Sequence, residues 1–223
     1  MSFVPYAQPS SQRRQPLDRP RIVAAALAVM DEVGVDGLTM RRVADQLGVT
    51  AAGLYRHVRA KDELLAMLAD EISGQVPTVT PGTPWQAALT EMAVGYRRVL
   101  LEHRDAARLL ASTPPAGPER LRQIEAILRV LVEAGFSGRD AAWAAYHFNN
   151  VVTEFVADEV RLGDTPRTEV MAQARSLLRS LPRDEFPTLT TFAEHIATDD
   201  AEGLFAFGVR LCLTGLEHLR QTE

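Results

Sequence analysis

The chain has 223 residues, 46% hydrophobic and 24% charged, proportions that are ordinary for a soluble globular protein of one large or two modest domains. It contains no run of ~18 apolar residues that would span a membrane and no apolar signal-peptide core, so we expect a cytoplasmic protein without a membrane partner. Its single cysteine, Cys212, excludes an internal disulfide and suits a reducing compartment.

The net charge of −5 is unevenly distributed along the chain. Residues 1–61 hold nine Lys/Arg and five Asp/Glu, a balance of +4, which leaves −9 for residues 62–223. A basic end on an acidic body suits a protein that binds a polyanion at one end only.

The N-terminal segment is rich in Pro, Ser and Gln and has no helical period, so residues 1–17 are predicted to be a disordered tail. Arg13 and Arg14 either reach into a DNA minor groove or are simply solvated. A first helix is expected from Asp18 or Arg19, with Pro20 in its first turn, to Gly34.

The stretch from Leu38 to Lys61 has the pattern of two short helices joined by a tight turn. Gly48 suits the left-handed end of the first helix, and Thr50 can accept hydrogen bonds from the first amides of the second. Leu54 and Val58 are the expected inward anchors of that second helix. This is the pattern of a helix-turn-helix, whose second helix enters the major groove of DNA.

The outward face of the second helix is expected to approach DNA closely. Ala51, Ala52 and Gly53 have almost no side chain, which lets the helix lie deep in a groove. Tyr55, Arg56 and His57 follow with hydrogen-bond donors for phosphates or base edges.

The sequence GLTMRRVADQLGVTAAGLYRHVRAKDELL closely resembles the DNA-binding domain of the tetracycline-repressor family of bacterial transcription regulators. The resemblance implies that the groove-facing residues are Thr39, Arg41, Thr50, Ala51, Ala52, Tyr55, Arg56, His57 and Lys61. Among them, Arg41 is the best candidate for reading a base, because arginine can pair bidentately with guanine. Arg42 and Arg59 are interpreted as plain solvent-exposed residues.

Beyond this unit the whole chain is predicted to be helical, an all-α fold. A helix over Lys61 to Gly74 links the DNA-binding unit to the rest, and VPTVTPGTP after it marks a domain boundary. The predicted domains are therefore 18–75, which binds DNA, and 76–223, which binds an effector and dimerises. Further helices are expected over residues 84–102, 104–111, 119–134, 138–162, 167–180, 188–197 and 200–220.

The last of these helices has two apolar faces. Phe205, Val209, Cys212 and Leu216 are expected in the core of the monomer. The other face consists of residues at seven-residue spacing and the leucines between them: Ala201, Leu204, Gly208, Leu211 and Gly215. An unpartnered apolar face implies a partner helix, although an entirely intramolecular helix remains the alternative. The resemblance implies a homodimer that presents two recognition helices to a pseudo-palindromic operator on double-stranded DNA.

The C-terminal half resembles the tetracycline-repressor branch of the family through W-Q, HRD, GFS and FGV-x-LCLTGLE. The positions that match the drug cavity of that branch are Met92, Tyr96, Leu110, Thr113, Ile127, Trp143, His147, Asn150 and Glu154. Leu110 stands where the branch has its magnesium-binding histidine, and Pro77 and Met92 replace a drug-binding histidine and asparagine. We therefore expect no metal and no cofactor, and a small-molecule effector that is largely apolar, aromatic or polyketide-like.

Three functions compete at this point. The leading one is a transcriptional repressor released by its effector, and the second is a DNA-binding dimer without an effector. The third is an enzyme that uses His147 and Glu154 as an acid–base or metal pair. Because no HExxH, phosphate loop, nucleophile elbow or acidic metal motif is present, the protein is not expected to be an enzyme.

Overall fold

The computed structural model describes residues 16–161 and 165–222, which form twelve helices and no strand, so the all-α prediction is confirmed. The first seven helices are α1 (Arg19–Gly37), α2 (Met40–Leu47), α3 (Ala51–Tyr55), α4 (Lys61–Gly74), α5 (Trp85–Glu102), α6 (Ala106–Ser112) and α7 (Pro118–Glu133). The others are α8 (Gly138–Val160), α9 (Arg167–Ser180), α10 (Pro187–Thr191), α11 (Ala193–Ile196) and α12 (Ala201–Thr222). The predicted tail, with Arg13 and Arg14, falls almost wholly outside the described residues.

Most predicted helices are found within one or two residues of their expected ends. Asp18 caps α1 by accepting from the Arg21 N–H (3.0 Å), and α1 bends at Gly34, whose φ of 74° breaks the helical path. The prediction of one helix over residues 188–197 is wrong. The segment forms two short helices, α10 and α11, because the backbone of Phe192 (φ −100°, ψ 14°) is not helical and separates them. The expected end of α8 at Leu162 lies outside the described residues.

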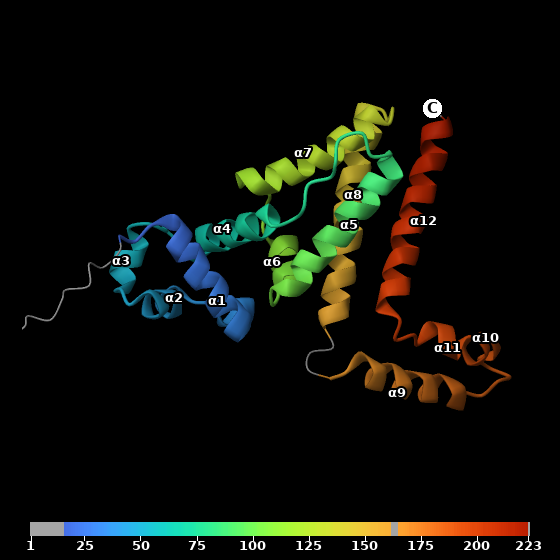
Figure 1. The fold of residues 1–223 in the computed structure, drawn as a ribbon. Helices are drawn as coiled ribbons and strands as arrows, with labels where there is room; N and C mark the ends of the chain where they lie inside the picture. The colour runs from blue at the N-terminus through green and yellow to red at the C-terminus, as the bar shows by residue number, and fades with distance from the viewer. Residues whose placement is uncertain (1–15, 162–164, 223) are drawn as a thin grey trace, which may run out of the picture.

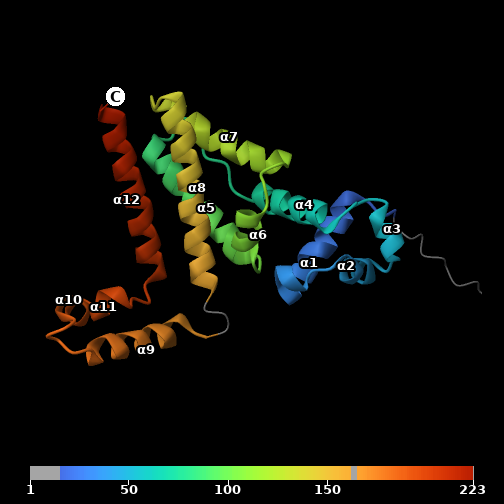
Figure 2. The same cartoon turned by 180° about the vertical axis from the view of Figure 1, so that it is seen from behind.

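The helices form a head, a body and an arm (Figures 1 and 2). The head is α1–α3, the body is α5–α8 with α12, and the arm is α9–α11. Helix α4 lies between head and body and packs against α1, α6 and α7. The division at residues 75 and 76 therefore remains a prediction, since α4 contacts both parts.

The head is also held by the loop before α6. Asp105 (φ 59°) accepts from the Val35 N–H through Oδ2 at 2.9 Å, just past the bend of α1. The Arg104 guanidinium donates to the Glu32 carbonyl (2.8 Å), and the Arg104 N–H donates to Asp31 Oδ1 (3.1 Å). The end of α1 is thus fixed to the body independently of α4.

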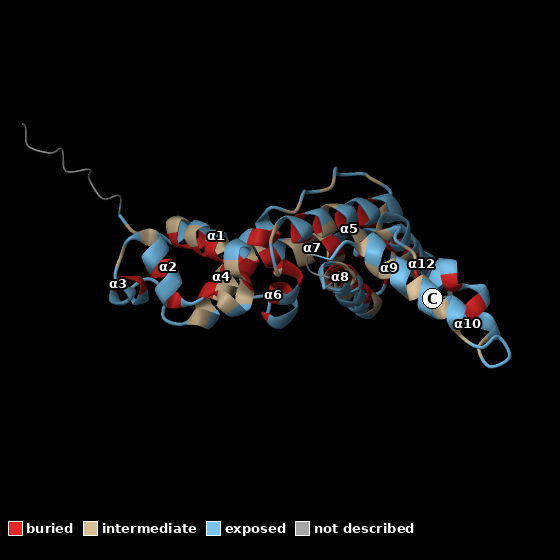
Figure 3. Ribbon diagram, turned by 90° about the horizontal axis from the view of Figure 1, so that it is seen from below, coloured by how far each residue is buried: buried red, intermediate tan, exposed pale blue. Residues whose placement is uncertain are grey.

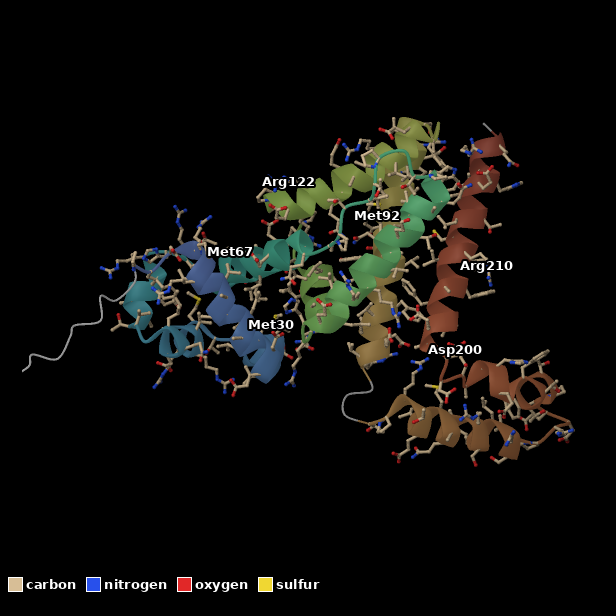
Figure 4. The ribbon with its side chains drawn as sticks, in the orientation of Figure 1. Met30, Met67, Met92, Arg122, Asp200 and Arg210 are labelled. Atoms are coloured by element: carbon tan, nitrogen blue, oxygen red, sulfur yellow. The ribbon has the colours of Figure 1, made fainter. Side chains whose placement is uncertain are left out.

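Helix α12 packs on α8 and α5, with an arginine clamp at the junction. The Arg97 guanidinium from α5 bonds Glu159 of α8 (2.8 Å) and Glu202 of α12 (2.6 Å) and lies 4.9 Å from the centre of the Phe205 ring. Asp200 caps α12 by accepting from the Gly203 N–H (2.8 Å; Figure 4). Of the predicted core face, Phe205, Val209 and Leu216 are buried and Cys212 is half-buried.

The arm extends from the far ends of α8 and α12 (Figures 1 and 2). Its α9 packs mainly on α10 and α11 and buries none of its own residues, so it is coloured largely as exposed in Figure 3. Arg175 and Arg179 of α9 hold α11 through the Ala197 carbonyl (2.7 Å) and the Glu194 carboxylate (2.6 Å), respectively.

Candidate nucleic-acid interface and ligand cavity

The local structure of the predicted helix-turn-helix follows from two caps and one glycine. Thr39 accepts from the Arg42 N–H (3.2 Å) at the start of α2, and Thr50 accepts from the Gly53 N–H (3.1 Å) at the start of α3. Gly48 ends α2 in the left-handed region (φ 66°, ψ 34°), where a side chain would be strained. Leu54 and Val58 are fully buried, which fixes α3 against the head.

All but one of the residues predicted to face DNA are exposed in the head: Thr39, Arg41, Thr50, Ala51, Ala52, Tyr55, Arg56 and His57. The exception, Lys61, is half-buried, and its Nζ donates to the Val35 carbonyl (3.4 Å). Arg41 stays near the surface beside Asp45, with Nε 4.0 Å from the carboxylate. Apart from Lys61, the residues predicted to face DNA are thus accessible to solvent on α2, on α3 and in the turns beside them.

Two details differ from the sequence-based interpretation. Gly53 is buried and does not face outward: a Cβ there would lie 3.3 Å from the Thr50 Oγ1 that caps the helix, so the glycine serves the cap. Arg42 is not merely solvated, because its guanidinium donates to the Gly37 carbonyl (2.9 Å) and closes the α1–α2 connection.

The body contains a cavity of about 710 Å³ between α6, α7 and α8. Its apolar walls include Leu110, Ile124, Ile127, Leu128 and Ala145, and its polar groups include Thr113, Gln123, Asn149, Asn150 and Thr153. This size, with apolar walls and a few polar groups, is what a site for a small organic molecule requires. Of the predicted effector contacts, Leu110, Thr113, Ile127, Asn150 and Glu154 line it.

The other four predicted contacts lie elsewhere. Met92 is buried on α5 (Figure 4). It lines a separate groove of about 330 Å³, which the segment 76–83 also lines. Tyr96 lies behind the cavity wall: its hydroxyl is 3.3 Å from the Thr153 Oγ1, and burial raises the pKa of its phenol. Trp143 is 62% exposed and His147 is also exposed.

The position of Trp143 and His147 has a geometric cause. The cavity face of α8 runs through Ala142, Asn149 and Thr153. The predicted stripe of residues 143, 147, 150 and 154 is rotated from that face around the helix, so only Asn150 and Glu154 reach the cavity. Within one monomer, Trp143 and His147 therefore do not line this cavity, and their contact with an effector stays a prediction.

Sequence reasoning missed one charged residue of the cavity, Arg120, which is only 9% exposed. Its guanidinium donates to the carbonyls of Leu110 (2.6 Å) and Thr113 (2.5 Å) at the end of α6. Burial lowers the pKa of Arg120, and Tyr96 and Asp70 act in the opposite direction. Its spacing from Ile124, Ile127 and Leu131 on the inward stripe of this helix was the available sequence signal.

The side chain of Asp70, on α4, caps the first turn of α7. Its Oδ1 accepts from the Arg120 backbone N–H (2.9 Å), so an α4 carboxylate caps another helix. Gly117 makes this approach possible, since a Cβ there would lie 2.1 Å from the Asp70 Cγ. This hydrogen bond therefore joins α4, which leads to the head, to α7, which forms a wall of the cavity.

The described residues contain no group of three or more His, Cys, Asp or Glu side chains able to hold a metal ion. Nor does any helix among them have the length and apolar character needed to cross a membrane.

Comparison with protein families gives two matches. The family of bacterial regulatory proteins named tetR matches residues 22–68, and the tetracyclin repressor-like C-terminal domain matches residues 77–220. The members of this family are transcriptional regulators and not enzymes.

Individual relatives and solved structures agree with these matches. The chain is 32% identical over 214 residues to the tetracycline repressor protein class C of Escherichia coli, covering 92% of this chain and 93% of the relative. It is 29% identical to the transcriptional repressor DrrR1 of Streptomyces coeruleorubidus, covering 95% and 82%. The structure of ActR from Streptomyces coelicolor in complex with actinorhodin is similar with a TM-score of 0.84 and 32% identity, over 90% of this chain and 95% of ActR. BioQ, solved with its double-stranded DNA operator, gives a TM-score of 0.65 and 28% identity, over 90% and 98%. The chain therefore belongs to the tetracycline repressor family of transcriptional regulators.

Proposed function

We propose that the protein is a homodimeric repressor that binds a pseudo-palindromic operator and is released from it by a small, largely apolar effector. The observation that carries the proposal is the structural connection between the cavity in the body and the DNA-binding helices of the head. The cavity wall α7 begins on a carboxylate of α4, and α4 leads directly into the head. A molecule that moves α6 or α7 therefore changes the position of α3.

The head supports the DNA-binding part of this function. Its exposed residues on α2 and α3 combine small side chains with arginine, tyrosine and histidine donors. BioQ, a related structure, is bound to a double-stranded operator, and the same use is proposed for this chain.

The cavity supports control by an effector. A DNA-binding dimer without an effector would have a filled body, whereas about 710 Å³ is open between α6, α7 and α8. ActR has been solved with actinorhodin, and a comparable organic molecule is the proposed occupant here. Leu110 lines this cavity where the tetracycline-repressor branch has its magnesium-binding histidine, so the proposed effector binds without a metal held at that position.

The exposed face of α12 supports the homodimer. Leu204 is 43% exposed and Leu211 is 63% exposed, and the two glycines beside them leave room for another helix. The neighbouring α8 also exposes a large apolar side chain, Trp143. A second copy of this chain, packed through α8 and α12, would cover these side chains and place two heads on one side.

The test is selection of duplex sites from a random DNA pool, followed by mass measurement of the complex and titration with aromatic compounds. We expect a two-fold symmetric site, two protomers for each site, and loss of the complex with at least one compound that enters the cavity. Selection of an asymmetric site by a monomer would contradict the dimeric repressor. A complex that persists while the cavity is saturated would contradict release by an effector.

A further inference from the structure

The strongest unexplained feature of the cavity is a buried positive charge without a negative partner. Among the described residues that line the cavity, Arg120 and Glu154 alone are charged, and Glu154 is exposed to water. Arg120 is 9% exposed, and none of the described carboxylates forms an ion pair with its guanidinium. A charge buried in this way destabilises a fold unless it is compensated.

The contacts of Arg120 leave donors free. A guanidinium has five N–H groups, and the Leu110 and Thr113 carbonyls accept from one each. The remaining three have no acceptor among the described residues, although the side chain lines the cavity. Asp70 compensates the charge only in part, because its carboxylate bonds the Arg120 backbone N–H instead of the guanidinium.

We propose that the effector is an amphiphilic organic anion, with a carboxylate or a comparably acidic group that pairs with Arg120 and an aromatic or otherwise apolar body. The apolar part would pack against Leu110, Ile127 and Leu128. This inference rests on the proposed function and narrows its ligand class from an apolar molecule to an apolar acid. Arginine suits the role because its planar donors match a carboxylate bidentately.

The contacts of Arg120 also connect a bound anion to α6 and α4. The guanidinium is bonded to the last turn of α6, and the backbone of the same residue is bonded to Asp70 of α4. An anion that draws the guanidinium toward the cavity competes with the α6 carbonyls for its N–H groups. Arg120 is therefore placed to transmit occupancy to α6 and α4 together.

The test uses two dyes with one fluorophore. 8-Anilinonaphthalene-1-sulfonate carries an anionic group, and N-phenyl-1-naphthylamine lacks it. Each is titrated into the full-length protein and into Arg120→Gln, Arg120→Lys and the control Arg98→Gln. Arg98 is an exposed arginine of α5 that pairs with Glu102 and does not line the cavity.

We expect the wild type and Arg98→Gln to bind the anionic dye about tenfold more tightly than the neutral one. Arg120→Gln should weaken the anionic dye about tenfold and change the neutral dye by less than about twofold. Arg120→Lys should keep part of the preference, because it keeps the charge. Equal affinity of the wild type for both dyes overturns the proposal whether or not any variant folds. An unchanged preference in Arg120→Gln also overturns it and leaves Arg120 as a residue that only ties α6 to α7.

A second variant locates the dyes. Ala142→Trp puts a large ring at the exposed edge of the cavity and should weaken both dyes. If neither is weakened, the preference arises elsewhere and the proposal fails. Failure of the proposed function would look different: the dyes would show the expected preference and dependence on Arg120, but no anionic occupant of the cavity would release the selected operator.

Discussion

At the scale of single residues, Asp105 stabilises the junction of head and body, although it lies in a short loop before α6. It adopts a left-handed backbone (φ 59°), which aspartate and asparagine tolerate better than alanine, and its carboxylate accepts from the Val35 N–H. Both effects fix the end of α1 beside the body. The contact joins residues 70 positions apart in the chain and fixes the end of α1 together with the bonds of Arg104.

We therefore predict that Asp105→Ala lowers the free energy of unfolding by about 1–3 kcal/mol, measured by urea denaturation. Asp105→Asn keeps an acceptor oxygen and tolerates the same backbone, so it should lose less. If the two substitutions were equally harmful, the negative charge of Asp105 would matter more than the hydrogen bond to Val35.

At the scale of helices, the junction of α4 and α7 depends on the absence of a side chain at Gly117. We predict that Gly117→Ala destabilises the protein by about 1–3 kcal/mol, because the new Cβ would meet the Asp70 carboxyl and force the two helices apart. Thermal unfolding of Gly138→Ala is the control, since a Cβ at Gly138 has no atom within 4 Å. Gly138→Ala should be neutral or slightly stabilising, and a similar loss in both variants would refute the steric explanation.

The exposed face of α12 gives a second prediction for this scale. Leu211→Glu should produce a folded monomer, seen by sedimentation velocity and by an unchanged helical circular dichroism spectrum, because a buried unpaired carboxylate opposes association. Thr214→Glu, on the side of α12 that faces α5, is the matched control and should remain dimeric. A dimer in both variants would place the contact elsewhere.

The sequence predicted the helices better than it predicted the cavity. Apolar spacing, Gly48 and the caps Thr39 and Thr50 are local signals, so α1–α4 followed directly from them. The sequence did not predict the break between α10 and α11, because the residue at the break is Phe192 and not a glycine or proline. The core face of α12 was predicted correctly, because Phe205, Val209 and Leu216 are buried, whereas the pairing of its exposed face with a second copy stays a prediction.

The cavity required knowledge of how α8 is rotated against α6 and α7. Spacing along α8 shows which residues share a stripe, but not which stripe faces its neighbours. Asn150 and Glu154 lie at the edge of the cavity face, whereas Trp143 and His147 are turned to the surface. Arg120 was missed for a different reason: a charged residue in an amphipathic helix is usually solvated, and its burial is a tertiary effect.

At the scale of the whole molecule, charge is separated along its length. Residues 1–61 carry +4 and the remainder −9, and in Figure 1 the head lies at the opposite end from the arm. Operator affinity should therefore fall steeply as salt rises, because cations released from DNA phosphates drive the binding.

We predict that Arg56→Gln makes the negative slope of log affinity against log salt concentration shallower by about 1, the value for one phosphate contact. Arg179→Gln, an exposed arginine of the arm that pairs with Glu194, should leave the slope unchanged. The measurement is fluorescence anisotropy of labelled operator at several salt concentrations. Equal slopes for wild type and Arg56→Gln would remove Arg56 from the DNA-binding surface.

The bond from Asp70 to the start of α7 also limits how α4 can travel. If α4 slid along its axis, the Arg120 amide would lose its acceptor, whereas tilting about Asp70 keeps the bond intact. Such a tilt would have Asp70 as its pivot, and Lys61, nine residues away, would lie at the end of a lever arm of roughly 13 Å at 1.5 Å per residue. A tilt of about 5° would swing that end by roughly 1 Å, and two such swings in a symmetric pair would alter the distance between their recognition helices.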